Sequence, residues 1–579
     1  MKVLGIYDWH NAGASLVEDG RLIAAIEEER FSRNKIEFGF PYRSIEAVMR
    51  ITNTNWTEID AVAVAGVRDP IFFARWQPHL FKFRRKMGAY WSLQYALWRA
   101  IYAARDFGPL PSLERFLSRR IVEGRLKALA GIPPEKIFLV DHHLAHAASG
   151  YRTSGFDRAL VFALDGSGDG HSSTVFRGKG GELTFLAGAS ERASLGKLYS
   201  NVTLGLGFKK ISDEGKVMGL AAHGDPGAFY PIIDSVIRIR DLDTLDMEAT
   251  EDLVGNTFAK KIKNIYSQRY SREDISAAVQ RKLEETVCAI VEHFVKREGI
   301  ANVVFVGGVA SNVRMNQRVR EMECVDELFI FPNMTDGGLS SGAALEVCYQ
   351  EGKKRGKIFP PYKLPHVFLG PDYSEEEIAE AIRRNKLKAE WVEDINSRIA
   401  ELVASGKIVA RFTGKMEFGP RALGHRSTLA LPSAPGIEDE LNRRFKRDEF
   451  MPFAPSLLEE YAAEYLVGGQ RSPYMVETFT VADGYSEKFP AVIHVDHTLR
   501  PQTVDRETTP GYWEIIKKVG DLTGLYIVLN TSYNMHGEPI VCSPQDALNT
   551  FRHGCVDYLA MGHYLIKYPG DESQEEMKG

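Results

Sequence analysis

The stretch Leu160-Val-Phe-Ala-Leu-Asp165, continued by Ser172-Ser-Thr-Val-Phe176 and Glu182-Leu-Thr-Phe185, decides the fold, because its plan occurs twice. An apolar strand ends in Asp, and a glycine-containing turn leads to a returning strand and then to a third. The earlier copy reads Val3-Leu-Gly-Ile-Tyr-Asp8, Gly13-Ala-Ser-Leu-Val17 and Arg21-Leu-Ile-Ala-Ala25. Such strand–turn–strand units are hairpins. The repetition predicts two similar α/β lobes that close on a nucleotide, with the site in the cleft between them.

Glycine turns follow two further segments of the second copy. Val303-Val-Phe-Val306 predicts a buried strand, and Gly307-Gly308 leads from it into a helix that starts at Val313. Glycines permit a tight turn, and the free N–H groups of a helix start favour an anionic or polar ligand. A similar turn, Thr335-Asp336-Gly337-Gly338, precedes a helix that starts near Ser340. We expect a ligand to approach the backbone closely at these turns.

The chain is long enough for more than one domain. Its 579 residues exceed the roughly 250–300 at which a single core stops growing. Prolines and glycines cluster at Pro360-Pro361, Pro365 and Gly370-Pro371 before a new helical pattern begins at Glu375. We therefore predict a first domain over residues 1–355, a linker over 356–373 and an independent α/β domain over 374–579.

Composition excludes several classes of protein. The net charge of −5 gives no reason to expect nucleic acid or an anionic membrane as a partner. The five cysteines form no C-x-x-C pair, which argues against zinc ribbons and disulfides and suits a reducing cytosol. No apolar run reaches the ~18 residues of a membrane span, and the apolar run in the first residues is too short for a signal peptide. We expect a cytoplasmic protein.

One segment is much more basic than the chain as a whole. Residues 68–125 contain twelve Lys/Arg and four Asp/Glu, interleaved with aromatic residues. The segment could form a surface that binds an acidic ligand, RNA or lipid. It could also form amphipathic helices that bury their aromatic side chains in a domain or subunit interface, which would suit a homodimer. We favour the second interpretation.

Two histidines in Val140-Asp-His-His-Leu-Ala-His146 have the spacing of metal ligands. On a helix, His142 and His146 lie one turn apart on the same face. Two neutral imidazoles at this spacing make half of a metal site, which carboxylates from elsewhere in the fold would complete. Asp165 and Asp336 are candidates for these carboxylates. Helix-surface or hydrogen-bonded core histidines are the alternative.

The second predicted domain contains arginines in an unusual setting. Arg421 and Arg426 lie among glycines and prolines, where a charged helix surface is not expected. Planar guanidinium groups in such a turn suit phosphate oxygens. Further on, Asn530-Thr-Ser532-Tyr-Asn534 follows an apolar strand, and hydroxyls and amides at strand ends commonly contact ligands. Buried Arg–carboxylate pairs and turn caps are the structural alternative for each of these residues.

These segments together resemble a known family, the NodU/CmcH O-carbamoyltransferases, which carbamoylate hydroxyl groups of nodulation factors and antibiotics such as the cephamycins and the aminoglycoside nebramycin. The resemblance spans essentially the whole chain. It is carried by Gly5-Ile-Tyr-Asp8-Trp-His10, Glu27-Glu-Glu-Arg30-Phe-Ser-Arg33, Asp141-His-His-Leu-Ala-His146, Leu164-Asp165-Gly-Ser-Gly-Asp169-Gly170, Glu214-Gly-Lys216-Val-Met218, Gly307-Gly-Val-Ala-Ser-Asn312, Glu417-Phe-Gly-Pro-Arg-Ala-Leu-Gly424 and Asn530-Thr-Ser-Tyr-Asn534.

The resemblance implies a fold and a reaction. The N-terminal domain would have the duplicated actin/hexokinase-like (ASKHA) fold, and the C-terminal domain would be YrdC-like. The C-terminal domain would make carbamoyl adenylate from carbamoyl phosphate and ATP, and it would bind the ATP together with Mg²⁺. The carbamoyl group would then pass to a hydroxyl of a small natural product at the N-terminal site.

The resemblance also assigns residues. It implies that Fe²⁺, or another divalent first-row metal, is bound by His142, His146, Asp165 and Asp336. His10 matches the general base. Asp8, two residues earlier on the same predicted strand, would point to the same face and orient His10 or the acceptor. The adenylate would be bound by Glu214, Lys216, Gly307, Gly308 and Asn312. Carbamoyl phosphate and ATP would be bound by Lys415, Arg421, Arg426, Lys446, Arg447, Arg500, Ser532 and Asn534.

The chain departs from the family pattern at two positions. Lys415 stands where arginine is usual, so it keeps the charge without the bidentate fork. His497 replaces a glycine, where the backbone would need a positive φ or a close approach to ligand.

Two other functions are left open. One is a carbamoyl-type transferase acting on tRNA, with the basic segment 68–125 as its docking face. The other is a nucleotide-binding regulator that does not catalyse a reaction. The presence of a candidate general base argues against this function.

Overall fold

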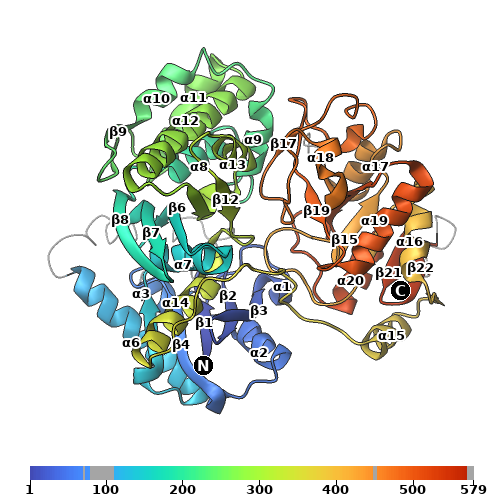
Figure 1. Ribbon diagram of the computed structural model, residues 1–579, viewed down its shortest axis with the longest axis horizontal. Coiled ribbons are helices and arrows are strands. Elements are labelled where there is room, and N and C mark those ends of the chain that lie inside the picture. Colours follow the sequence, from blue (N-terminus) through green and yellow to red (C-terminus); the bar gives the residue numbers. More distant parts are fainter. Residues whose placement is uncertain (70–71, 79–109, 448–452, 570–579) are drawn as a thin grey trace.

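The computed structural model describes residues 1–69, 72–78, 110–447 and 453–569. Figure 1 shows three bodies. We call the one built on strands β1 to β5 lobe I (blue), the one built on β6 to β12 lobe II (cyan to green), and the one that begins with helix α15 (Glu375–Arg384) the C-terminal unit (gold to red).

Lobe I is built on a five-stranded sheet of order β3-β2-β1-β4-β5. Its first three strands form an antiparallel meander, and β4 and β5 continue parallel to β1. The strands are β1 (Lys2–Tyr7), β2 (Gly13–Glu18), β3 (Arg21–Glu27), β4 (Ile59–Ala65) and β5 (Ile137–Val140). Its helices include α1 (Glu29–Ser32), α2 (Tyr42–Ile51), α3 (Phe72–Trp76) and α6 (Leu110–Ala130).

Lobe II repeats this plan. Its main sheet has the order β12-β11-β6-β7-β8, again an antiparallel meander extended by two parallel strands. The strands are β6 (Arg158–Gly168), β7 (His171–Lys179), β8 (Glu182–Ser190), β11 (Asn302–Val306) and β12 (Glu327–Ile330). The predicted duplication is therefore confirmed, with the same strand order and directions in both lobes. This is the arrangement expected for the actin/hexokinase-like prediction.

The helices of lobe II cover a large apolar core. They are α8 (Leu195–Gly205), α9 (Glu214–Ala221), α10 (Tyr230–Val236), α11 (Thr257–Asn264), α12 (Arg272–Glu298) and α13 (Val313–Arg320), with β9 (Ile237–Asp241) and β10 (Asp246–Ala249) as a hairpin. Helix α12 begins after Ser271, whose side chain accepts from Asp274 N–H, and ends at Gly299 with φ +60°. These are ordinary signals for the start and end of a helix.

Two helices join the lobes through a shared core. Helices α7 (His142–Ser154) and α14 (Leu339–Lys354) contribute to one apolar cluster together with strands of both sheets. A Cβ on Gly342 of α14 would lie 1.7 Å from the Ala145 carbonyl oxygen, and one on Gly5 of β1 would lie 1.9 Å from that of Ser340. Glycine at both positions allows direct backbone packing, so α14 lies close against both α7 and β1.

A carboxylate at the β6–β7 turn ties lobe I to the start of α7. Asp169 accepts hydrogen bonds from four backbone N–H groups: Val67 (2.9 Å), Arg68 (2.6 Å), Asp69 (2.8 Å) and His142 (2.8 Å). The side chain is buried, with 8% exposed. Bonds from neutral donors to an ionised acceptor are among the stronger protein hydrogen bonds. Asp169 therefore fixes the loop after β4 and the first residue of α7 together.

The C-terminal unit has its own mixed sheet, of order β13-β22-β21-β14-β15-β20-β16-β19. Its strands are β13 (Glu390–Trp391), β14 (Val409–Phe412), β15 (Arg426–Ala430), β16 (Ala454–Leu458), β19 (Gln502–Val504), β20 (Ile527–Ser532), β21 (Tyr558–Met561) and β22 (Tyr564–Lys567), and β17 (Phe479–Thr480) pairs with β18 (Thr498–Leu499). Its helices are α15 (Glu375–Arg384), α16 (Ile395–Ala404), α17 (Ile437–Arg444), α18 (Ala462–Tyr465), α19 (Pro510–Thr523) and α20 (Pro544–Phe551). The α/β prediction is confirmed here, while the likeness to YrdC stays a prediction.

The segment between α14 and α15 contacts both neighbours. Leu364 N–H donates to Thr153 O, and Gly370 N–H donates to Met416 O, each at 2.9 Å. This segment includes the predicted linker and is ordered by these bonds. The division into residues 1–355, 356–373 and 374–579 remains a prediction.

Helix α13 of lobe II holds the C-terminal unit. Arg320 forms an ion pair with Glu477 at 3.0 Å, and both side chains are largely buried. Nearby, Asn316 Nδ2 donates to Val476 O at 2.7 Å, and Thr478 Oγ1 donates to Gln317 Oε1 at 2.7 Å. These polar contacts dock the C-terminal unit on the helix that follows the Gly307-Gly308 turn.

Most of the basic aromatic segment 68–125 falls on residues 70–71 and 79–109, which lie outside the described residues. Neither the docking-face nor the dimer-interface interpretation is therefore tested. In the part of the chain that the structure describes, no helix combines the length and the apolar character needed to cross a membrane.

Replacing Asp169 by Asn should weaken the link between lobe I and α7. The amide has one acceptor oxygen, and its NH₂ would face backbone N–H groups that then lack a partner. We expect the free energy of unfolding to fall by roughly 1–3 kcal/mol, measured by urea unfolding. Asp326→Asn, at an exposed aspartate, should stay within about 0.5 kcal/mol of wild type. Equal losses in both variants would contradict the role given to Asp169.

Candidate functional site

The predicted histidine pair lies at the start of α7. Asp141 caps the helix, because its side chain accepts from Leu144 N–H at 3.0 Å. His142 is therefore the first helical residue, and His146 follows one turn later on the same face. The two imidazole centroids are 4.8 Å apart, and both side chains are buried.

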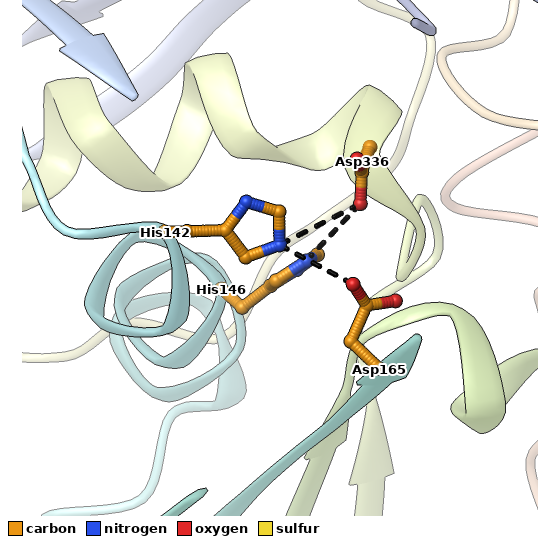
Figure 2. A group of neighbouring side chains, drawn as sticks. All are labelled: His142, His146, Asp165 and Asp336. Carbon is orange, nitrogen blue, oxygen red and sulfur yellow. Dashed lines mark hydrogen bonds and ion pairs between the residues drawn. The ribbon is translucent and has the colours of Figure 1, made fainter. Parts of the chain in front are cut away.

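Two carboxylates complete the cluster from lobe II. Asp165 lies in β6, and Asp336 begins the short helix η5 (Asp336–Gly338) that leads into α14. One ligand atom from each of the four residues lies within 4.8 Å of the others. His142 Nε2 is 3.3 Å from Asp165 Oδ2, and His146 Nε2 is 3.4 Å from Asp336 Oδ1. Figure 2 shows both imidazoles extending from α7 toward the two carboxylates.

The donor set fits a divalent metal ion. Within the described part of the chain, His142 Nδ1 and both ring nitrogens of His146 make no hydrogen bond, although they are buried. Burial alone would lower the pKa of His142, but the carboxylates of Asp336 and Asp165 raise it to about 10. The cluster thus stabilises a positive charge between two buried carboxylates. Two imidazoles and two carboxylates suit a first-row divalent metal.

Neighbouring residues make room for this arrangement. A Cβ on Gly168 would lie 2.1 Å from the His142 ring, so only glycine leaves the imidazole its place. His143, between the two cluster histidines, points elsewhere. Its Nδ1 is 3.0 Å from Thr174 Oγ1, and its Nε2 is 3.1 Å from His171 O. His143 is therefore a hydrogen-bonded core histidine of the kind that was the alternative for the whole motif.

His10 lies at the edge of the cluster. Its Nε2 is 3.4 Å from Asp336 Oδ2, and its side chain is 26% exposed. Its backbone forms an isolated β-bridge with Phe38, and the two rings pack edge to face. The predicted general base is thus both open to solvent and close to a buried carboxylate.

Tyr7 belongs to the same site but was not predicted from the sequence. Its hydroxyl donates to Asp336 Oδ2 at 2.7 Å, and the side chain is buried. Burial, together with the charge of Asp336, raises the pKa of Tyr7 well above its usual value, so the hydroxyl keeps its proton. A signal existed: Tyr7 occupies a core-facing position of its strand, and a buried tyrosine hydroxyl needs a partner.

Asp8 does not take the position that the sequence suggested. Its carboxylate accepts a hydrogen bond from Arg75 Nε at 3.1 Å, and both side chains are fully buried. Arg75 also donates to the carbonyl oxygens of Ala65 and Gly66. The expected alignment with His10 assumed a strand through both residues, but β1 ends at Tyr7 and Asn11 has φ +57°. Asp8 therefore supports the loop after β4 instead of orienting His10.

The glycine turn lies beside the cluster, as expected. Gly307 has φ +91°, and a Cβ there would lie 2.2 Å from Leu164 O. Gly308 N–H donates to Asp165 Oδ1 at 2.8 Å. The turn therefore needs glycine and also anchors one of the carboxylates.

The other residues expected at the adenylate have structural partners. Asn312 caps α13 by accepting from Met315 N–H at 3.0 Å, and its amide bonds the Gln280 side chain. Glu214 accepts from Ser200 Oγ and Ile211 N–H, each at 2.7 Å. Lys216 Nζ lies 5.9 Å from the centre of the Phe208 ring. Asn312 acts as a helix cap, a role that Asn fills often.

Three of the predicted arginines form a cation cluster in the C-terminal unit. Burial, together with the nearby charges of Arg421 and Arg447, lowers the pKa of Arg500 well below its usual value. Burial also lowers the pKa of Arg421 to about 10. Arg500 Nε is buried without a hydrogen bond to any described residue. Half-buried like charges whose repulsion lowers the pKa of Arg500 suit an anionic ligand.

Arg426 has a structural role instead. It is fully buried and donates to the carbonyl oxygens of Thr413, Gly414 and Pro371, with its guanidinium 3.8 Å from the centre of the Phe412 ring. The prediction that it binds phosphate is therefore not supported by its contacts. The loop that carries Arg421 is organised by Glu417, whose Oε1 accepts from the N–H groups of Leu423, His425 and Arg426.

The remaining predicted residues of the C-terminal unit differ in exposure and in their contacts. Lys415 and Lys446 are exposed, and Ser532 is the last residue of β20. Asn534 holds a turn by donating to Met535 O and Glu538 O, each at 2.9 Å. His497 has φ +59°, so the conformation that a glycine would favour is retained with a side chain present.

Two cavities adjoin these groups. One, of about 240 Å³, lies between α9, α12 and α13 and the C-terminal unit, and its lining includes Gly219, Gln280, Arg314, His494, Asp496 and Arg500. The other, of about 540 Å³, lies in lobe I, and its lining includes Glu28, Asn34, Glu37, Phe38, Phe40 and Tyr42. Phe38, whose backbone pairs with that of His10, is one of the residues that line the second cavity.

Comparisons with known proteins agree with this organisation. The family model described as Carbamoyltransferase N-terminus matches residues 2–345, and Carbamoyltransferase C-terminus matches residues 400–568. Nodulation protein NolNO of Sinorhizobium fredii is 33% identical, over 96% of this chain and 79% of that protein. Nodulation protein NolO of Bradyrhizobium diazoefficiens is 36% identical, over 74% and 79%. The uncharacterized protein MJ1051 of Methanocaldococcus jannaschii is 34% identical, over 97% and 99%.

The two family models together match most of the chain, and the NolNO and MJ1051 relatives extend over nearly all of it. The chain therefore belongs to the carbamoyltransferase family and is a carbamoyltransferase enzyme.

Proposed function

We propose that the enzyme is an ATP-dependent O-carbamoyltransferase that acts on a hydroxyl group of a small natural product. Carbamoyl adenylate would form in the C-terminal unit, and transfer would occur at His10. The observation that carries the proposal is the contact between His10 and Asp336, which joins a solvent-accessible base to a buried His/Asp cluster.

The cation cluster supports adenylate formation in the C-terminal unit. Hydrolysis of carbamoyl phosphate would release phosphate and carbamate, and a carbamate oxygen would attack the α-phosphorus of ATP with release of pyrophosphate. Both substrates are polyanions, and ATP would be bound with Mg²⁺. Arg421, Arg447 and Arg500 lie close enough to repel one another, and a phosphate group would relieve that repulsion.

The smaller cavity supports an internal route for the adenylate. It is bounded by Arg500 of the C-terminal unit and by helices α9, α12 and α13 of lobe II. The Gly307-Gly308 turn, which precedes α13, lies against Asp165. An adenylate that passes along this interface would reach the metal-ligand cluster without entering bulk water.

At the transfer site the chain supplies a base and a ligand set. His10 would take the proton of the acceptor hydroxyl as the oxygen attacks the carbamoyl carbon, and AMP would leave. The imidazolium would be stabilised by Asp336 Oδ2, which lies 3.4 Å from Nε2. His142, His146, Asp165 and Asp336 would hold Fe²⁺ or another divalent metal, which when bound polarises the carbonyl and offsets charge on the leaving phosphate.

The larger cavity supports a small acceptor. Its lining includes Phe38, which pairs with His10, and combines aromatic rings with the carboxylates of Glu28 and Glu37. A volume of about 540 Å³ falls in the range that holds small molecules. Aromatic faces would contact the apolar parts of a natural product, and polar groups would orient its hydroxyl.

Arg421→Ala should separate the two half-reactions. With ATP and carbamoyl phosphate but no acceptor, we expect pyrophosphate release to fall roughly 10- to 100-fold, because a charge-assisted bond is worth roughly 1.5–3 kcal/mol. His10→Ala should release pyrophosphate as wild type does. Arg443→Ala, at an exposed arginine paired with Glu440, is the control and should match wild type. Loss of pyrophosphate release in His10→Ala with normal release in Arg421→Ala would contradict the assignment.

His146→Ala should abolish stoichiometric metal binding. The purified protein, reconstituted with Fe²⁺ under anaerobic conditions, should hold one ion per chain in wild type and close to none in the variant, because one ligand of a four-residue set is lost. His143→Gln is the matched control: this buried histidine bonds Thr174 rather than the cluster. It should keep one ion. Equal iron content in all three proteins, measured by elemental analysis, would argue against this ligand set.

A further inference from the structure

Tyr7 connects the first strand of lobe I to the carboxylate that lobe II supplies. It is the last residue of β1, with 1% of its surface exposed, and its hydroxyl donates to Asp336 Oδ2 at 2.7 Å. Its ring packs edge to face against both His10 and His142, each with centroids 6.4 Å apart. Tyr7 therefore touches the base, one histidine and one carboxylate of the site.

The two oxygens of Asp336 face different partners. Oδ1 faces His146 Nε2 at 3.4 Å and His142 Nε2 at 3.8 Å. Oδ2 faces the Tyr7 hydroxyl at 2.7 Å and His10 Nε2 at 3.4 Å. A carboxylate that rotated about its Cβ–Cγ bond would exchange these roles. The bond from Tyr7 is the shortest of the four contacts, so it does most to fix the rotation.

Asp165 is held in a comparable way. Its Oδ1 accepts from Gly308 N–H at 2.8 Å, and its Oδ2 faces His142 Nε2 at 3.3 Å. Each carboxylate of the cluster therefore has one anchored oxygen and one oxygen directed at the imidazoles. The anchor of Asp165 is a backbone group of lobe II, whereas the anchor of Asp336 is a side chain of lobe I.

We propose that Tyr7 is a positioning residue that holds Asp336 as a ligand through Oδ1 alone and reserves Oδ2 for His10. The inference rests on the proposed metal centre. It makes Tyr7 the means by which lobe I sets the geometry of a ligand from lobe II. Hydrogen bonds to metal ligands of this kind commonly change metal affinity by roughly 10- to 100-fold.

Tyr7→Phe tests the hydroxyl while keeping the ring. Metal-free protein would be titrated with Co²⁺, a probe whose visible absorption reports the number and geometry of its ligands. We expect the dissociation constant to rise roughly 10- to 100-fold and the absorption band to change intensity, because Asp336 could then turn and bind through both oxygens. Thermal unfolding of each protein would be recorded in parallel.

Tyr151→Phe is the matched control. Tyr151 is a fully buried tyrosine on α7, the helix that carries both cluster histidines, and its hydroxyl donates to Asp157 O at 2.8 Å. This variant loses that bond and the one that the hydroxyl accepts from Gly181 N–H at 3.1 Å, both away from the cluster. It should bind Co²⁺ with the affinity and the spectrum of wild type.

The outcomes separate this inference from the proposed function. If Tyr7→Phe binds Co²⁺ with the affinity and spectrum of wild type, the positioning role is overturned and the metal centre stands. If Tyr7→Phe and Tyr151→Phe weaken binding equally with unchanged spectra, the effect is general destabilisation and the role is likewise overturned. If wild type binds neither Co²⁺ nor Fe²⁺, the metal centre fails and the role of Tyr7 fails with it.

Discussion

The carboxylate of Asp169 is the constraint on which the site depends. Four backbone N–H groups converge on it, three from the loop after β4 and one from His142. A helix start normally has N–H groups without partners, and here one of them is used to join two lobes. Because the first residue of α7 is fixed in this way, the direction of both imidazoles toward Asp165 and Asp336 follows from the helix itself.

The duplicated lobes have diverged at equivalent positions. Each first strand leads to an aspartate, Asp8 in lobe I and Asp165 in lobe II, but their charges are balanced differently. Asp8 is neutralised by the buried guanidinium of Arg75, whereas Asp165 faces His142 and receives Gly308 N–H. Lobe I contributes to the cluster through the neighbouring residue, Tyr7. A shared backbone plan therefore carries a structural ion pair in one copy and a carboxylate of the His/Asp cluster in the other.

Much of the fold could be predicted from the sequence, because strand–turn–strand patterns are local and occur twice. The four-residue cluster could be anticipated because the spacing of His142 and His146 is itself helical geometry. Asp165 and Asp336 were candidate carboxylates, which the family resemblance then assigned to the same site. Contacts between distant segments could not be anticipated. Whether Arg426 meets a ligand or backbone carbonyls depends on where Thr413 and Gly414 lie after folding. The same holds for Asp8, whose partner is 67 positions away along the chain.

The docking of the C-terminal unit on α13 limits how this enzyme can be divided. The Arg320–Glu477 pair is largely shielded from solvent, with side-chain exposures of 12% and 7%. If the chain were cut between the two parts and the fragments separated, both side chains would become solvated, and the hydrogen bonds that Asn316 and Thr478 make across the interface would be lost. In evolutionary terms, a division into two genes would require both products to keep this interface, so that the separate chains could still assemble.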